Sequence, residues 1–179
     1  RKYWYNKNKL GYRPYQYVLN KEAIMATRTI RIESDPILRK VSKEVTKFDE
    51  SLWALLEDMA QTMYEADGVG LAAPQIGLLK RIFVIDIGEG LVEFINPQVV
   101  LEDGEQFGEE GCLSVPKKYG PVRRPNRVRM RAQNRMGEWF EIEGEELMAR
   151  AMLHENDHLD GKLFVDFVEG ELVQLSDEE

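Results

Sequence analysis

The chain contains very little cysteine and histidine, and it has no long apolar run. Of its 179 residues, only Cys112 is a cysteine and only two are histidines. A single cysteine excludes an intrachain disulfide and favours a reducing compartment. The longest apolar run, at residues 81–87, suits a buried strand and is far too short to span a bilayer. The length fits one domain with its own core, and we expect no membrane partner.

Basic residues are also scarce, with 24 Lys/Arg against 32 Asp/Glu and a net charge of -8. Residues 1–24 hold six of the basic residues and only one acidic residue, so the rest of the chain is still more acidic. Phosphate backbones would repel such a body. We therefore expect no direct nucleic-acid substrate.

The first 24 residues differ in kind from the rest. They hold six Tyr or Trp residues and no Ser or Thr, whereas an organellar transit peptide should be rich in serine. From Met25 onward the sequence has the character of a new N-terminus, and we interpret Met25 as the native initiator. The expected organisation is a non-native or upstream extension at 1–24, followed by one catalytic domain at 25–179.

Periodicity predicts two helices among several short strands. The first helix follows the cap Asp49, runs to about Ala66 and carries an apolar stripe at residues 52, 55, 56, 59 and 63. The second spans residues 145–159 and ends at Gly161. We expect strands at 81–87, 91–95, 99–102 (after a break at Asn96-Pro97), 127–132 and 138–143, the last two joined by a hairpin loop. Without βαβ alternation, these elements predict an α+β fold in which antiparallel strands pack around the second helix.

Six arginines lie between Arg123 and Arg135. Such a cluster can bind RNA, but Arg127, Arg129 and Arg131 share one side of a predicted strand. The solvated face of a strand is the simpler interpretation, and we prefer it.

The only two histidines lie four residues apart, in His154-Glu-Asn-Asp-His158. At about 100° per residue, both imidazoles leave the same face of a helix one turn apart, as metal binding from a helix requires. Glu155 lies beside them, where it can reach a bound water without being a ligand. A lone histidine is usually a core residue, but this pair at ligand spacing favours a metal site. Leu147 and Ala151 share the same arc, and either core packing or a substrate pocket explains them equally well.

A third ligand must come from elsewhere in the chain. No third histidine exists, and only a short acidic tail follows His158. The natural candidate is Cys112. A single cysteine is by itself more often a small buried apolar residue, but the histidine pair favours a thiolate ligand.

The stretch Gly68-Val-Gly-Leu-Ala-Ala-Pro-Gln75 contains a weak dinucleotide-binding pattern. It follows a predicted helix rather than a strand, and Pro74 interrupts the helix that should hold the phosphates. We expect the glycines instead to permit close backbone approach to an extended ligand.

Three stretches together resemble peptide deformylase: residues 68–75, Glu110-Gly-Cys-Leu-Ser114 and residues 154–161. The resemblance extends from about Thr29 to about Asp166. It implies a metal-dependent amidohydrolase that removes the N-formyl group from formyl-methionine of nascent polypeptides and releases formate. In that family the metal is usually Fe2+, and the ligand set is also compatible with Zn2+, Ni2+ or Co2+.

The resemblance also assigns further roles. Glu155 moves the proton, while the Gln75 side-chain amide and the Leu113 backbone N–H stabilise the oxyanion. The substrate lies extended along Val69, Gly70 and Gly111.

Partners and location follow from the same resemblance. The implied partners are the formylated nascent peptide and, transiently, the ribosome, in a bacterial-type cytoplasm. No long basic helix follows Asp166, which argues against docking on the ribosome through such a helix. Two rival interpretations are a metallopeptidase of other specificity and a structural metal site, although structural sites generally use four protein ligands.

Overall fold

The computed structural model describes residues 26–175, so the expectation for residues 1–24 and Met25 lies outside the described residues. This part of the chain forms two α-helices, three short 3-10 helices and eight strands. In chain order they are η1 (Pro36–Arg39), α1 (Glu50–Glu65), β1 (Gly70–Ala72), η2 (Ala73–Ile76), β2 (Ile82–Ile85), β3 (Val92–Asp103), β4 (Gln106–Cys112), β5 (Val115–Arg124), β6 (Arg127–Gln133), β7 (Trp139–Glu145), α2 (Glu146–Leu159), η3 (Phe164–Asp166) and β8 (Val173–Gln174).

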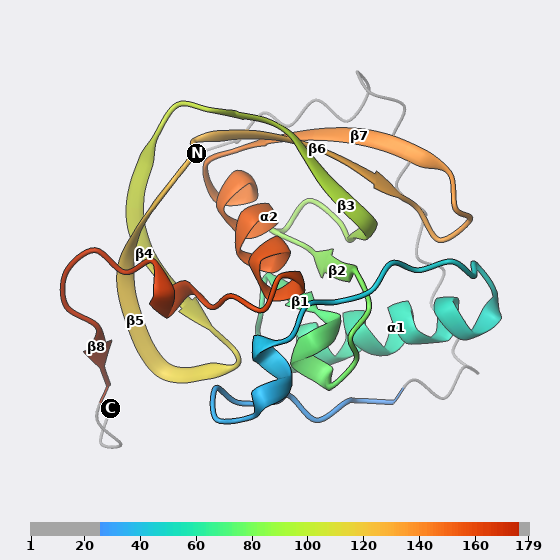
Figure 1. Ribbon diagram of the computed structural model, residues 1–179, viewed down its shortest axis with the longest axis horizontal. Helices are drawn as coiled ribbons and strands as arrows, with labels where there is room; N and C mark the ends of the chain where they lie inside the picture. The colour runs from blue at the N-terminus through green and yellow to red at the C-terminus, as the bar shows by residue number, and fades with distance from the viewer. Residues whose placement is uncertain (1–25, 176–179) are drawn as a thin grey trace.

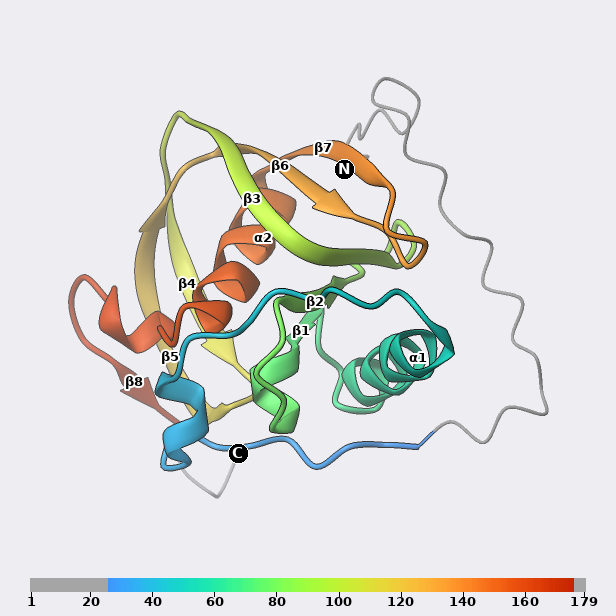
Figure 2. The same cartoon turned by 45° about the vertical axis from the view of Figure 1, so that its right-hand side comes forward.

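The strands form two antiparallel sheets. One has five strands in the order β1-β2-β3-β6-β7, and the other has three in the order β4-β5-β8. Helix α2 lies between the long strands β3, β6 and β7 on one side and the β4–β5 hairpin on the other (Figures 1 and 2). The predicted α+β class with antiparallel sheets is confirmed.

Helices α1 and α2 cover opposite faces of the β1–β2 end of the larger sheet. The α1 core contains Leu71 and Val84, whereas the α2 core contains their chain neighbours Ala72 and Phe83. Successive residues of a strand point to opposite faces, so the two helices pack on different sides. Helix α1 begins after Asp49, whose side chain accepts a hydrogen bond from the backbone N–H of Leu52, and it buries an apolar stripe at residues 52, 55, 56, 59 and 63.

The predicted break at Asn96-Pro97 is wrong, because β3 runs through it. The irregularity appears instead as a register shift against β6 between Ile95 and Gln98, which is the pattern of a bulge. Asn96 has a positive φ of 51° and exchanges hydrogen bonds of 2.8 Å with the backbone of Val45. Strand β3 therefore accommodates this turn-forming pair as a bulge, and the Val45 backbone holds the Asn96 side chain.

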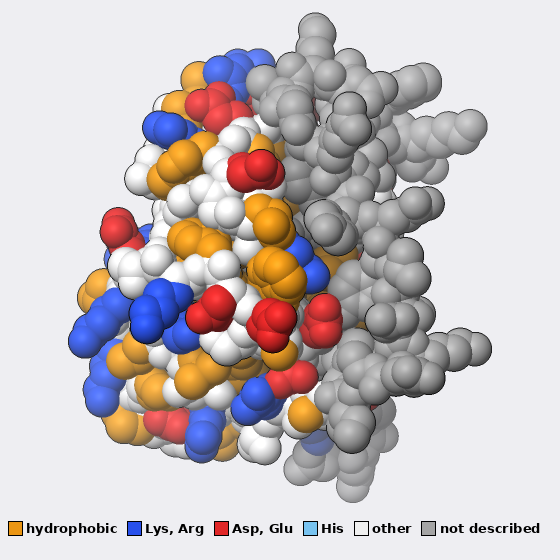
Figure 3. All heavy atoms as spheres, turned by 90° about the vertical axis from the view of Figure 1, so that its right-hand side faces the viewer, with side chains coloured by type: hydrophobic (Ala, Val, Ile, Leu, Met, Phe, Trp, Pro, Cys, Tyr) orange, Lys and Arg blue, Asp and Glu red, His pale blue; other side chains and the backbone are white. Residues whose placement is uncertain are grey.

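The β6–β7 hairpin is confirmed, and its arginines lie on a partly exposed face. Arg129 donates to Glu143 across the hairpin, and the guanidinium of Arg131 lies 4.5 Å from the Trp139 ring centroid. On the face of the molecule shown in Figure 3, acidic and basic side chains are interspersed with apolar ones. Among residues 26–175, no helix combines the length and apolar character needed to cross a membrane.

Candidate metal centre and active site

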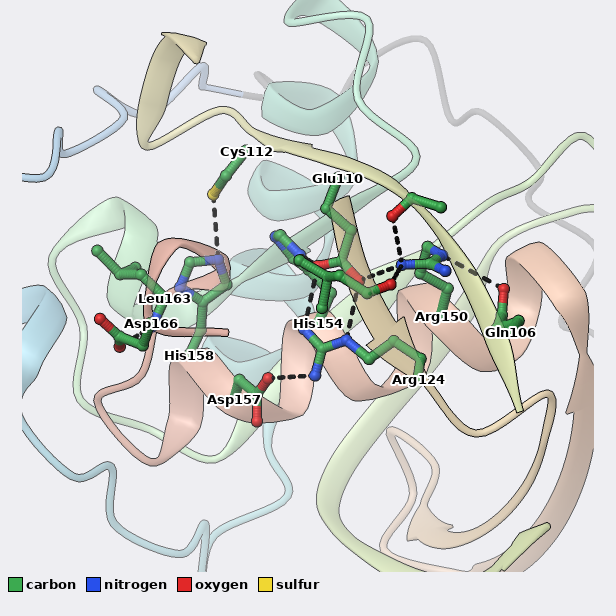
Figure 4. A network of polar contacts seen from close by, with 12 residues as sticks. Gln106, Glu110, Cys112, Arg124, Arg150, His154, Asp157, His158, Leu163 and Asp166 are labelled. Carbon is green, nitrogen blue, oxygen red and sulfur yellow. Dashed lines mark hydrogen bonds and ion pairs between the residues drawn. The ribbon is translucent and has the colours of Figure 1, made fainter. Parts of the chain in front are cut away.

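The three predicted ligands converge from two elements. Helix α2 supplies His154 and His158, and Cys112 stands at the end of β4. Their ligand atoms all lie within 4.8 Å of one another, and Cys112 Sγ is 3.3 Å from His158 Nε2 (Figure 4). One thiolate and two imidazoles in this arrangement form a donor set suited to a divalent transition metal.

Helix α2 ends at Leu159, one residue after His158, and Gly161 fixes this end. Gly161 has a φ of +71°, and its N–H donates to the His158 carbonyl. A Cβ at this position would come 2.6 Å from the carbonyl oxygen of Arg39, so the close approach of the η1 segment requires glycine. This turn ends the helix directly after the second ligand.

Glu155 is buried against the β1 backbone. A Cβ at Gly70 would lie 2.9 Å from Glu155 Cδ, so only glycine leaves room for the carboxylate. Its Oε2 is buried and has no hydrogen-bond partner among residues 26–175. Burial raises the pKa of Glu155 to about 7, although the nearby His154 acts in the opposite direction. A buried carboxylate with a free oxygen and a pKa near neutrality is suited to proton transfer.

A cavity of about 430 Å³ opens over these groups. Cys112, His154 and Glu155 line it, whereas His158 lies behind them and is 1% exposed. The edge strands of the two sheets, β1 and β4, face the cavity from opposite sides. An extended peptide can pair with free strand edges of this kind.

The predicted substrate-binding residues all line this cavity. Val69 and Gly70 lie at its β1 edge, and Gly111 lies at its β4 edge. Leu147 is 49% exposed at the opening, whereas Ala151 is 5% exposed and belongs also to the α2 core. Ala151 therefore both packs in the core and lines the cavity.

The two predicted oxyanion donors also line the cavity. The Gln75 side chain is 1% exposed, and its Oε1 accepts a hydrogen bond from the Ala72 backbone N–H at 2.8 Å. Its Nε2 points at Ser114 Oγ (3.2 Å) and Cys112 Sγ (3.6 Å). Leu113 occupies the turn between β4 and β5. The amide thus reaches Cys112 from the η2 side.

A buried charged network behind His154 was missed by the sequence interpretation. Glu110 accepts a hydrogen bond from His154 Nδ1 at 2.9 Å, while Arg124 and Arg150 both donate to its carboxylate. Asp157 accepts from Arg124 on the other side (Figure 4). Burial opposes the charge on Glu110, but the hydrogen bonds from His154 and Arg124 outweigh it and lower the pKa to about 2.

The interpretation of the arginine cluster as a solvated face is wrong for Arg124. Its side chain is 7% exposed and forms ion pairs of 2.8 Å with Glu110 and 2.6 Å with Asp157. The available signal was the glutamate two residues before the cysteine, since a metal-binding histidine usually donates its second N–H to a carboxylate.

This network leaves the histidines suitable for a metal. Because Nδ1 of His154 faces Glu110, Nε2 is the nitrogen left for a ligand bond. Burial lowers the pKa of His158 well below its ordinary value, which favours the neutral, metal-binding ring. Burial acts on His154 in the same sense, but its contacts with Cys112 and Glu110 raise its pKa; a metal ion held here would take the place of such a proton.

Comparison with known proteins agrees with this geometry. The family model described as polypeptide deformylase matches residues 27–172. A peptide deformylase from Clostridium botulinum (strain Alaska E43 / Type E3) is 61% identical over 142 residues, covering 79% of this chain and 97% of that protein. The crystal structure of a peptide deformylase from Legionella pneumophila has a TM-score of 0.78 at 50% identity, covering 80% of this chain and 87% of that one. For the Thermotoga maritima peptide deformylase the TM-score is 0.80 at 46% identity, with 81% and 99% covered.

Proposed function

We propose specific roles for the site residues of this chain, which belongs to the peptide deformylase family. Members of this family are hydrolases that remove the N-formyl group from the N-terminal formylmethionine of nascent peptides. Cys112, His154 and His158 hold one divalent metal ion, and Glu155 moves the proton. The observation that carries this proposal is the convergence of the three ligand atoms within 4.8 Å, beside Glu155, which lines the cavity and has a buried carboxylate oxygen without a hydrogen-bond partner among the described residues.

The metal supplies the activation that amide hydrolysis needs at neutral pH. A divalent ion lowers the pKa of a bound water and polarises a carbonyl oxygen. One thiolate leaves a formal charge of +1 on the centre, because both imidazoles are neutral. That donor set suits Fe2+, Zn2+, Ni2+ or Co2+, and we propose Fe2+ as the native ion, as is usual in the family.

The chain's own groups complete the reaction. Glu155 takes a proton from the attacking water at its free oxygen and returns it to the leaving amine. The Gln75 amide and the Leu113 backbone N–H donate hydrogen bonds to the oxygen that gains negative charge. Gln75 is well placed for this role, because Ala72 already fixes its side-chain oxygen and its N–H groups therefore face the site.

The substrate binds as an added strand between the two sheets. The backbone at Val69 and Gly70 offers one edge, and Gly111 offers the other. A Cβ at Gly111 would come 2.7 Å from Tyr119 Cδ1, so the Tyr119 ring on β5 leaves room only for glycine at this position. Leu147 and Ala151 then border the pocket for the methionine side chain. We also propose a cytoplasmic location and only transient contact with the ribosome, where nascent peptides emerge.

Protein purified without oxygen is expected to contain one iron ion per chain and to release formate from formyl-Met-Ala-Ser. Exposure to air should then abolish most of this activity, because a partly exposed thiolate beside iron is prone to oxidation. Iron analysis and formate detection on one sample measure both. Nickel-loaded protein is the control and should keep its activity in air.

The same assay separates the rival functions. Met-Ala-Ser, which lacks the formyl group, should remain intact, whereas its cleavage would indicate a metallopeptidase instead. Undiminished activity of the iron form in air would contradict the assignment of Fe2+.

A further inference from the structure

The metal ligands come from two structural units that share no apolar core. Helix α2 contributes to one buried apolar cluster together with β1, β2, β3, β6 and β7. Strand β5 and Cys112 of β4 belong to another cluster, with η1 and η3. Among residues 26–175, no apolar cluster contains members of both α2 and the β4–β5 hairpin. Apart from the stacking of His154 on Phe164, whose ring centroids lie 6.2 Å apart, the described contacts that link Cys112 and β4 to the helix are polar.

These polar contacts form a regular series between β4 and α2. Every second residue of β4 contacts the helix, and every fourth residue of α2 contacts the strand. The contacts are Gln106 with the Glu146 carbonyl and Arg150, Gly108 with Arg150, Glu110 with Arg150 and His154, and Cys112 with His158. Two residues of a strand rise about 6.8 Å, and four residues of a helix rise about 6.0 Å. The two repeats nearly match, so one register satisfies all of these contacts together.

Arg150 makes the most contacts in this series. Its Nη1 donates to Glu110 Oε1 at 2.8 Å, to the Val122 carbonyl at 3.0 Å and to the Gly108 carbonyl at 3.3 Å. Its Nε lies 3.3 Å from Gln106 Oε1. Figure 4 shows its guanidinium between Gln106 and Glu110, one helical turn before His154.

Gly108 of β4 leaves room for the Arg150 guanidinium to make these contacts. A Cβ at Gly108 would lie 3.3 Å from Arg150 Nη2, so a larger residue would push the guanidinium away. The Arg150 side chain is only 10% exposed, and its charge is paired with that of Glu110, whose side chain is 3% exposed. A buried guanidinium with four protein acceptors fixes the strand and the helix in one relative position.

We propose that Arg150 is a positioning residue that sets the register of β4 against α2, and thereby the position of Cys112 relative to His154 and His158. This inference rests on the proposed metal-binding role of those three residues. Arg124 makes a parallel tie from Glu110 of β4 to Asp157 of α2, whereas Arg150 also binds β4 at Gln106 and Gly108.

The test compares Arg150→Met with Arg123→Met. Arg123 is an exposed arginine of the same hairpin, and its ion pairs are with Glu105 and Glu169, neither of which belongs to α2. Each protein is loaded with Zn2+, and release into a chromogenic chelator is timed. Release from Arg150→Met should be faster by about tenfold or more, the size of effect seen when supports of metal ligands are lost. Release from Arg123→Met should match the unchanged protein. With Co2+, the sulfur-to-cobalt absorption should weaken only in Arg150→Met.

A purely structural role makes a different prediction. It would lower the thermal stability of the metal-free Arg150→Met protein but leave Zn2+ release and the cobalt spectrum unchanged, and that result would overturn the proposal. Should Arg150→Met fail to fold, Arg150→Lys replaces it. One ammonium group cannot hold Gln106 and Glu110 together, so faster release is again expected and an unchanged rate contradicts the proposal. If the unchanged protein bound neither ion, the proposed metal site itself would fail.

Discussion

Glu155→Gln is expected to lower kcat/KM for formyl-Met-Ala-Ser by about 100-fold to 10,000-fold, the usual contribution of a general acid–base group. Glutamine keeps the size of the side chain that packs against Gly70, but it cannot accept the proton. Because Glu155 is not a ligand, the metal content should stay at one ion per chain. Formate release and elemental analysis on the same preparation measure the two quantities separately.

Glu146→Gln provides the matched control, since Glu146 is the other glutamate of α2 and its side chain is exposed outside the cavity. This variant should keep full activity. A Glu155→Gln protein that retained both its metal and the full rate would remove Glu155 from the proton-transfer role.

Cys112→Ala is expected to weaken Zn2+ binding by more than about 100-fold, because losing even a supporting contact costs about 10- to 100-fold. Two imidazoles remain as ligands, but both are neutral. The variant therefore lacks the only anionic ligand, whose charge partly neutralises the metal ion. Activity should fall with the metal content. Competition with a chelator of known affinity measures the change.

Ser114→Ala is the control for this substitution. It removes the hydroxyl that accepts a hydrogen bond from Gln75, two residues beyond Cys112, and leaves all three ligands in place. It should bind Zn2+ as the unchanged protein does. Equal Zn2+ affinity in Cys112→Ala would show that the third ligand lies elsewhere.

The local part of the site could be predicted from the sequence, because helical geometry alone places two histidines four residues apart on one face. The position of Glu155 next to them follows from the same rule. The structure places Cys112 beside this pair, although nothing in its own stretch of sequence determines that contact. The contact depends on how the β4–β5 hairpin packs on α2.

The long-range part could not be predicted. Strands β4 and β5 carry Gly108, Gly111, Pro116 and Pro121, which disguise the alternation of a strand. The bulge in β3 looks like a turn, since Asn96-Pro97 has turn-forming chemistry. The bonds of Glu110 to His154, Arg124 and Arg150 join residues 14 to 44 positions apart, and no local pattern encodes such pairings.

X-ray absorption of the Zn2+-loaded protein tests the proposed ligand set most directly. We predict one sulfur at about 2.3 Å and two imidazole nitrogens at about 2.0–2.1 Å from the metal. A spectrum without sulfur, or with imidazole signals from fewer than two rings, would contradict coordination by Cys112, His154 and His158.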